Sequence, residues 1–250
     1  MMPKNFHQFT ETTMDSRIEQ ILAFQKKSNY PNSCYISDKS TWKYIKYRVR
    51  RPIIKLFYKS YRKKNAPTPW LPPSVIEYFN QYLTKEMTGV EFGSGISTLF
   101  FAPKIKKIVS IEHDEAWYKQ IKKELANKNI DNIDYHLVKR NDGEKNNYPI
   151  PEFINTFNIS SEEYEYRKEF YEYFMRLEEY NDESFDFIIV DGRARPECVF
   201  ASIPKLKKKG ILVLDNSERH RYKIVFDRLK DWETCKASSG LTDTTFCIKP

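Results

Sequence analysis

The sequence has few cysteines and lacks any long apolar run. Four cysteines occur among 250 residues, and no two of them form a C-x-x-C pair or show a metal-type spacing. They are Cys34, Cys198, Cys235 and Cys247. Free thiols in a reducing compartment are therefore expected. No apolar stretch approaches the ~20 residues that span a bilayer, and the N-terminus lacks the apolar segment of a signal peptide. We expect a soluble cytoplasmic protein.

Acidic residues are missing from one stretch of the chain, residues 39–64. This stretch holds eleven Lys and Arg residues and no Asp or Glu, whereas the whole chain has a net charge of +8. Subtracting these eleven charges leaves −3 for the rest. The basic character thus belongs to one segment, and a nucleic-acid partner for the remaining chain is not expected.

The basic stretch belongs to a predicted helical N-terminal arm, residues 1–64. Aromatic and aliphatic residues alternate with its cations, and Pro52 is expected to divide it into two helical pieces. Three interpretations remain open: an arm packed on the protein with a solvated basic face, peripheral contact of residues 39–64 with an anionic membrane, or contact with a phosphate-bearing or nucleic-acid partner.

Four prolines in residues 65–73 predict a stiff linker, and residues 74–250 are predicted to form the catalytic domain. Apolar runs and helical patterns alternate through this domain, which indicates an α/β fold. Residues 144–182 are long for one connection and rich in aromatic residues. They are either an insert that faces the substrate or the ordinary helix of the sheet with a loop before it.

A glycine turn at residues 90–98 is the centre of this domain. Gly93 and Gly95 follow an apolar run that carries Glu91, and the position of a third glycine in dinucleotide fingerprints is occupied by Thr98. A second apolar run ends at Glu112, 21 residues after Glu91. That distance suits an acid that contacts ribose hydroxyls from the end of the second strand. The pattern predicts a nucleoside-cofactor site.

Two later apolar runs also end in acids, Asp191 and Asp215. The carboxyl ends of parallel strands meet at one edge of a sheet, so four acids are expected there. Such a cluster is unfavourable without ligands or cations. Arg193, Arg195 and Arg219 flank these acids and either neutralise them or bind an acidic acceptor.

These motifs resemble class I S-adenosylmethionine (SAM)-dependent methyltransferases over most of the chain after Trp70. The resemblance implies a doubly wound, mostly parallel seven-stranded sheet with the cofactor across the strand ends. It also implies that the helix after Ser74 and the proline linker border the cofactor. The expected cofactor-binding residues are Glu91, Gly93, Ser94, Gly95, Ser97, Glu112, His113, Asp142 and Asp191.

The expected catalytic residues are Asp191 and Asp215. Together with Asn216, they resemble the acid and acid-amide ligands of a divalent ion in metal-dependent O-methyltransferases, which implies a Mg²⁺ site. The alternative is that Asp191 contacts the substrate directly while Asp215 and Asn216 cap a turn. His136 is expected to be structural.

The predicted reaction is methyl transfer to a hydroxyl of a small molecule or glycan. The fourth strand end reads Asp-Gly-Arg-Ala at residues 191–194 rather than Asn/Asp-Pro-Pro-aromatic, which argues against methylation of base amino groups in DNA. Two alternatives remain: a nicotinamide-dependent oxidoreductase, and a non-catalytic binding or scaffold protein that has kept the fold.

Overall fold

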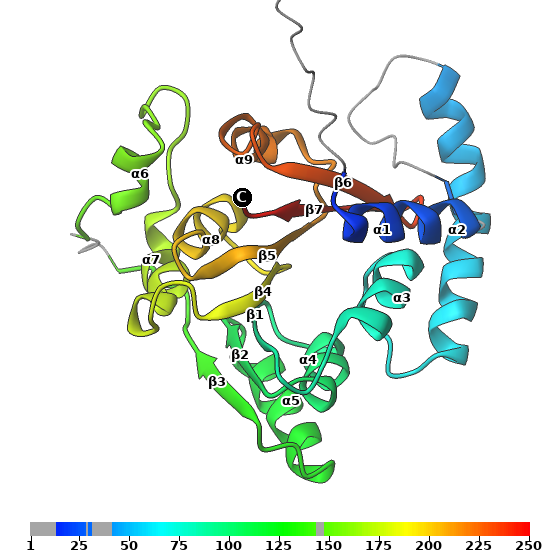
Figure 1. Cartoon of the computed structure of the whole chain (residues 1–250), viewed down its shortest axis with the longest axis horizontal. Coiled ribbons are helices and arrows are strands. Elements are labelled where there is room, and N and C mark those ends of the chain that lie inside the picture. The colour runs from blue at the N-terminus through cyan, green and yellow to red at the C-terminus, as the bar shows by residue number, and fades with distance from the viewer. Residues whose placement is uncertain (1–13, 29, 32–41, 144–147) are drawn as a thin grey trace, which may run out of the picture.

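The computed structural model describes residues 14–28, 30–31, 42–143 and 148–250. Its centre is a seven-stranded sheet with the strand order β3-β2-β1-β4-β5-β7-β6 (Figure 1). The strands are β1 (Thr88–Phe92), β2 (Lys107–Glu112), β3 (Ile133–Leu137), β4 (Phe185–Val190), β5 (Leu206–Asp215), β6 (Glu233–Ser238) and β7 (Asp243–Ile248). Strands β1 to β5 pair in parallel, and β7 is antiparallel to both of its neighbours. The predicted fold class, a mostly parallel seven-stranded sheet, is confirmed.

Helices cover both faces of the sheet, which is why its central strands are apolar on both sides. The α-helices are α1 (Ser16–Lys27), α2 (Trp42–Lys64), α3 (Pro73–Tyr82), α4 (Ile96–Phe101), α5 (Glu115–Asn127), α6 (Glu152–Thr156), α7 (Tyr171–Phe174), α8 (Arg195–Ser202) and α9 (Lys223–Arg228). In β4, Phe187 and Ile189 pack in the core that contains α1, α3 and α4. Ile188 and Val190 pack in the opposite core with α7, α8 and α9.

Helix α1 is part of this body because Gln25 ties it to the sheet. The side-chain amide of Gln25 donates to the carbonyl oxygen of Ser238 at 3.2 Å and accepts from the N–H of the same residue at 2.9 Å. The hydroxyl of Ser74 on α3 also donates to Gln25 at 2.7 Å. Both α1 and α3 lie on the sheet face opposite to α8. The expectation that α3 and the proline linker border the cofactor cavity is wrong, because no residue of either lines it.

Helix α2 runs without a break from Trp42 to Lys64, so the predicted division at Pro52 is wrong. Pro52 is exposed, and water can bind the carbonyl oxygen that loses its helical partner. The helix lies at the outer edge of the molecule beside α1 and α3 (Figure 1). The hydroxyl of Tyr58 donates to the carbonyl oxygen of Leu71 at 2.9 Å and holds the linker against the helix.

The described part of the insert contains only short helices: α6, α7 and the 3₁₀ turns Lys168–Phe170 and Met175–Glu179. Aromatic side chains such as Phe153 and Phe174 anchor it in the core on the α8 side. Residues 1–13, 29, 32–41 and 144–147, which include part of the predicted arm and Cys34, lie outside the described residues.

Three of the cysteines, Cys198, Cys235 and Cys247, are free, as the sequence predicts, and the structure shows that all three are buried. In the described part of the chain, no helix is both long and apolar enough to cross a membrane.

Candidate functional site

A cavity of about 730 Å³ opens at the carboxyl ends of β1, β2 and β4. The chain order of the strands reverses between β1 and β4, and open α/β sheets bind ligands at such a point. The glycine turn, the end of β2 and the first turns of α5 form one side of the cavity: Gly93, Ser94, Glu112, His113, Asp114, Ala116, Trp117 and Gln120. The loops after β4 and β5 and the insert form the other: Tyr164, Glu165, Arg167, Asp191, Gly192, Arg193, Ala194, Arg195, Pro196, Arg219, Arg221 and Tyr222.

The glycine turn after β1 touches the loop after β4. Gly93 has a φ of +94°, which favours glycine, and a Cβ atom there would lie 2.8 Å from the backbone nitrogen and Cα of Gly192. The N–H of Gly93 donates to the carbonyl oxygen of Ile111 at 2.8 Å, and the N–H of Asp191 donates to that of Phe92 at 2.9 Å. The floor of the cavity is therefore backbone, which a ligand can approach closely.

Glu112 is the fixed carboxylate of the cavity. Its Oε2 accepts from the N–H and the hydroxyl of Ser94, both at 2.9 Å, and its Oε1 accepts from the N–H groups of His113 and Asp114 at 2.8 Å. Burial raises its pKa, but these hydrogen bonds outweigh burial and hold the pKa of Glu112 below its ordinary value. Glu112 is thus ionised, and it binds the glycine turn to the end of β2.

Glu91 lies beneath the turn rather than in the cavity lining. Its Oε1 accepts from the hydroxyls of Ser110, at 2.6 Å, and Thr98. The hydroxyl of Thr98 in turn accepts from the N–H of Gly95 at 3.0 Å. Only 1% of Glu91 is exposed, and its Oε2 has no hydrogen-bond partner among the described residues. Burial raises the pKa of Glu91 to about 7. This acid therefore supports the turn from inside the protein.

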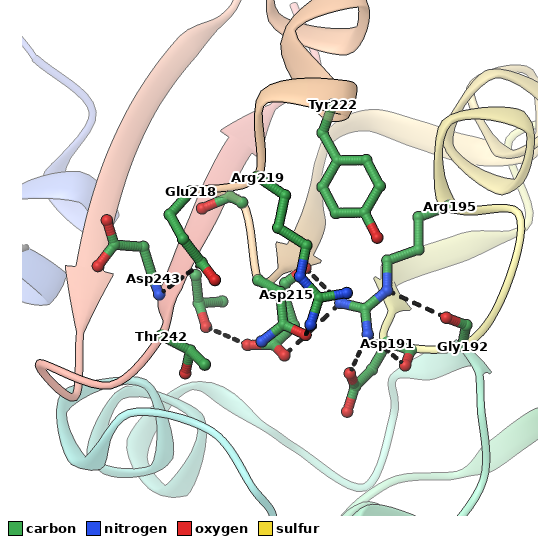
Figure 2. A network of polar contacts seen from close by, with 12 residues as sticks. Asp191, Gly192, Arg195, Asp215, Glu218, Arg219, Tyr222, Thr242 and Asp243 are labelled. Carbon is green, nitrogen blue, oxygen red and sulfur yellow. Dashed lines mark hydrogen bonds and ion pairs between the residues drawn. The ribbon is translucent and has the colours of Figure 1, made fainter. Parts of the chain in front are cut away.

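Arg195 lies between Asp191 and Asp215 (Figure 2). Its Nη2 donates to Oδ1 and to the carbonyl oxygen of Asp191, both at 2.8 Å. Its Nη1 donates to the carbonyl oxygen of Asp215 and lies 3.6 Å from Oδ2. Only 7% of Arg195 is exposed. Ala194, in a left-handed conformation, precedes α8 and places Arg195 in its first turn.

The structure does not support the expected Mg²⁺ site, because the guanidinium group of Arg195 lies between its two acids. Arg195 occupies the position of positive charge between the two acids, and Oδ1 of Asp215 accepts from the hydroxyl of Thr244 at 2.6 Å. The third expected ligand, Asn216, accepts from Arg219 at 2.7 Å through Oδ1. No group of three His, Cys, Asp or Glu side chains in the described residues could hold a metal ion. The donor set does not fit a divalent ion.

The cavity brings together five of the nine expected cofactor-binding residues: Gly93, Ser94, Glu112, His113 and Asp191. The other four, Glu91, Gly95, Ser97 and Asp142, lie outside its lining. Of these, Asp142 forms an exposed ion pair with Arg140 at 2.5 Å. Asp215 is also outside the lining, buried behind Arg195. His136 bonds to Tyr180 at 2.9 Å, away from the cavity.

Sequence reasoning missed several residues that line the cavity. Trp117 on α5 donates its indole N–H to the carbonyl oxygen of Ser94 at 2.6 Å, and Tyr164, Arg167, Arg221 and Tyr222 line the opposite side. Trp117 lies on α5, whose helical pattern does not show which of its residues face a cavity. Tyr164 and Arg167 lie on a loop, and Arg221 and Tyr222 lie in the short 3₁₀ helix His220–Tyr222, where no periodic signal marks them.

The strand order and the antiparallel β7 define the fold of class I SAM-dependent methyltransferases, so the resemblance holds for the fold. No protein-family model and no curated protein matches the sequence.

Solved structures with a similar fold include three bacterial proteins. A methyltransferase-like protein from Silicibacter pomeroyi has 21% identity and a TM-score of 0.48, over 74% of this chain and 89% of that one. An rRNA methylase from Streptococcus thermophilus has 12% identity and a TM-score of 0.47, over 70% and 93%. A provisionally assigned methyltransferase from Streptococcus mutans, solved with S-adenosylhomocysteine (SAH), has 11% identity and a TM-score of 0.48, over 72% and 99%.

Proposed function

We propose that the protein transfers the methyl group of SAM to a hydroxyl of a small molecule or glycan. The observation that carries this proposal is the contact of Gly93 with Gly192 beside the ionised Glu112, at the point where the strand order reverses. Bare backbone at this position accommodates a cofactor, and a carboxylate at the end of β2 accepts hydrogen bonds from ribose hydroxyls. SAM, when bound, supplies the methyl group and its sulfonium leaving group.

The residues of the chain would position the reactants, which accounts for much of the rate of a transfer between two bound molecules. The side chain of Asp191 is 33% exposed, so it is the acid of the Asp191–Asp215 pair that can contact an acceptor. Desolvation at the strand end and the neighbouring charge of Asp215 raise the pKa of Asp191, so its carboxylate is a stronger base than that of an ordinary aspartate. Asp215 is buried and would act only by holding Arg195 in place.

The small-molecule or glycan acceptor is supported by the wall opposite the cofactor side. Tyr164, Glu165 and Arg167 of the insert line the cavity, which favours the interpretation of the insert as a substrate wall. The loop after β4 reads Asp-Gly-Arg-Ala at residues 191–194, without the Pro-Pro-aromatic sequence of enzymes that methylate base amino groups in DNA. This difference argues against a DNA base as the acceptor.

A structure of the full-length protein crystallised with SAH tests the proposal. We expect SAH in the cavity with its ribose at Glu112 and its sulfur facing the side formed by Asp191 and Gly192. SAH bound outside this cavity would contradict the assignment of the site.

We also propose that α2 contacts an anionic membrane surface. Six large apolar residues of this helix are 51–74% exposed: Trp42, Ile45, Val49, Ile53, Leu56 and Phe57. Their spacing of three, four, four, three and one residues places them on one helical face. Ten Lys and Arg residues and no acid share this helix. An exposed apolar face flanked by cations is typical of helices that lie in the headgroup region of anionic bilayers.

Flotation with vesicles tests this contact in the full chain. Wild-type protein is expected to float with phosphatidylglycerol vesicles and not with phosphatidylcholine vesicles. A variant with Trp42, Val49 and Leu56 changed to Ser should remain unbound. Ile150→Ser, at a residue equally exposed but far along the chain, serves as the control. Equal flotation of the triple variant and wild type would contradict the proposal.

A further inference from the structure

The acceptor side of the cavity is rich in arginine. Five arginines line it, Arg167, Arg193, Arg195, Arg219 and Arg221, but only two acids, Glu165 and Asp191. The guanidinium groups come from three separate segments: the loop after β4, the loop after β5 and the insert. Like charges gathered from distant parts of a chain repel one another, so such a cluster implies an opposite charge from a ligand.

Two of these arginines are neutralised by the protein. Arg195 pairs with Asp191 and Asp215, and Arg167 pairs with Glu169 at 2.9 Å. Asp191, an acid of this side, is therefore already paired within the protein. The other three arginines of this side are Arg193, Arg219 and Arg221.

Arg193, Arg219 and Arg221 have only uncharged partners among the described residues. Arg193 donates from Nε to Nε2 of His113 at 3.3 Å, and Arg219 donates to the amide oxygen of Asn216 at 2.7 Å. Arg221 donates to the hydroxyl of Tyr222 at 3.1 Å. All three side chains are exposed. Figure 2 shows the Arg219 side chain pointing towards Asp215 and Arg195, so its charge adds to that of the buried guanidinium.

The charges of the cavity are separated by side. Glu112 and Asp114 lie on the side assigned to the cofactor, whose sulfonium is a cation, whereas the unpaired arginines lie on the opposite side. A guanidinium group presents a planar fork of donors that binds phosphate or carboxylate through two parallel hydrogen bonds.

We propose that the methyl acceptor carries a phosphate or carboxylate group bound by Arg193, Arg219 and Arg221. This inference rests on the proposed methyl transfer, because it assigns the other side of the cavity to SAM. It narrows the acceptor from any hydroxyl compound to an anionic one.

Calorimetric titration of inorganic pyrophosphate into the full-length protein saturated with SAH tests the inference. We expect binding to wild type and at least about tenfold weaker binding to the variant Arg219→Gln, Arg221→Gln, since charge-assisted bonds are lost. Arg50→Gln, at an exposed arginine of α2, should bind pyrophosphate like wild type. The affinity for SAH should stay within about twofold in all three proteins, because the two arginines lie on the acceptor side.

Each outcome has a separate meaning. Equal pyrophosphate binding by the double variant and wild type, or no binding by wild type that binds SAH, would overturn the anionic acceptor and leave methyl transfer intact. Failure of wild type to bind SAH would instead contradict the proposed function on which the inference rests.

Discussion

Arg195 donates a hydrogen bond to the carbonyl oxygen of Asp215 and lies 3.6 Å from its carboxylate. The same guanidinium bonds to Asp191 on the neighbouring strand end. One buried cation therefore joins the ends of β4 and β5 and compensates both of their acids. Removing one partner of such a buried cluster leaves uncompensated charge, which costs far more than the intact cluster contributes.

We expect Arg195→Leu to lower the free energy of unfolding by about 3–5 kcal/mol at neutral pH, because two acids lose their shared cation. Urea denaturation measures this loss. Burial raises the pKa of Asp191, so protonation relieves the repulsion and the loss should shrink in acid. Arg193→Leu, at the exposed arginine two residues earlier, should change stability by less than about 0.5 kcal/mol. Similar losses for both variants would contradict the role of Arg195.

Divalent ions should have no effect on the cavity, since Arg195 holds the position between the acids. Adding EDTA to wild-type protein, and then Mg²⁺, should change neither the melting temperature nor the affinity for SAH. Differential scanning calorimetry and isothermal titration measure the two quantities. A loss of SAH affinity in EDTA that Mg²⁺ restores would show that the acids bind a metal ion after all.

Glu91 predicts an unusual dependence of stability on pH. Burial raises its folded-state pKa from 4.5 to about 7, so the folded protein retains a proton that the unfolded chain releases between these pH values. The contribution of Glu91 to the free energy of unfolding is therefore largest below about pH 4.5 and falls as the pH rises to 7. The fall amounts to about 3 kcal/mol.

Glu91→Gln replaces the protonated acid with a neutral group of the same shape. This variant should lose that decrease and become more stable than wild type above pH 7. Urea denaturation at a series of pH values measures the difference, with the exposed Glu86→Gln as the control. Parallel pH profiles for Glu91→Gln and wild type would contradict the buried, protonated state.

The sequence predicted the parts of the fold that depend on local pattern. The apolar runs that end at Glu112 and Asp191 are strands β2 and β4, and the glycine turn lies where the motif places it. The continuity of helix α2 through Pro52 was harder to predict. Pro52 removes one backbone hydrogen bond, but at this exposed position water can bind the carbonyl oxygen that loses its partner.

The role of Arg195 could not be predicted from the sequence because it depends on how two strand ends meet in space. Asp191 and Asp215 are 24 residues apart in the chain, and the left-handed Ala194 determines where the guanidinium lies between them. Without knowledge of that geometry, the sequence around Asp191 and Asp215 resembled the ligands of a metal ion. For the same reason, Arg221 and Trp117 were not expected at the cavity: neither the short 3₁₀ helix His220–Tyr222 nor the pattern of α5 shows which space its residues face.

Titration of SAH and NAD into the full-length protein by isothermal calorimetry tests the central claim most directly. We expect one SAH site and no heat from NAD. Gly93→Ala should abolish SAH binding because its Cβ would lie 2.8 Å from the backbone of Gly192, whereas Gly143→Ala on an exposed loop should bind like wild type. Tight NAD binding without SAH binding would establish an oxidoreductase, and binding of neither would favour a scaffold protein; both results would contradict a methyltransferase.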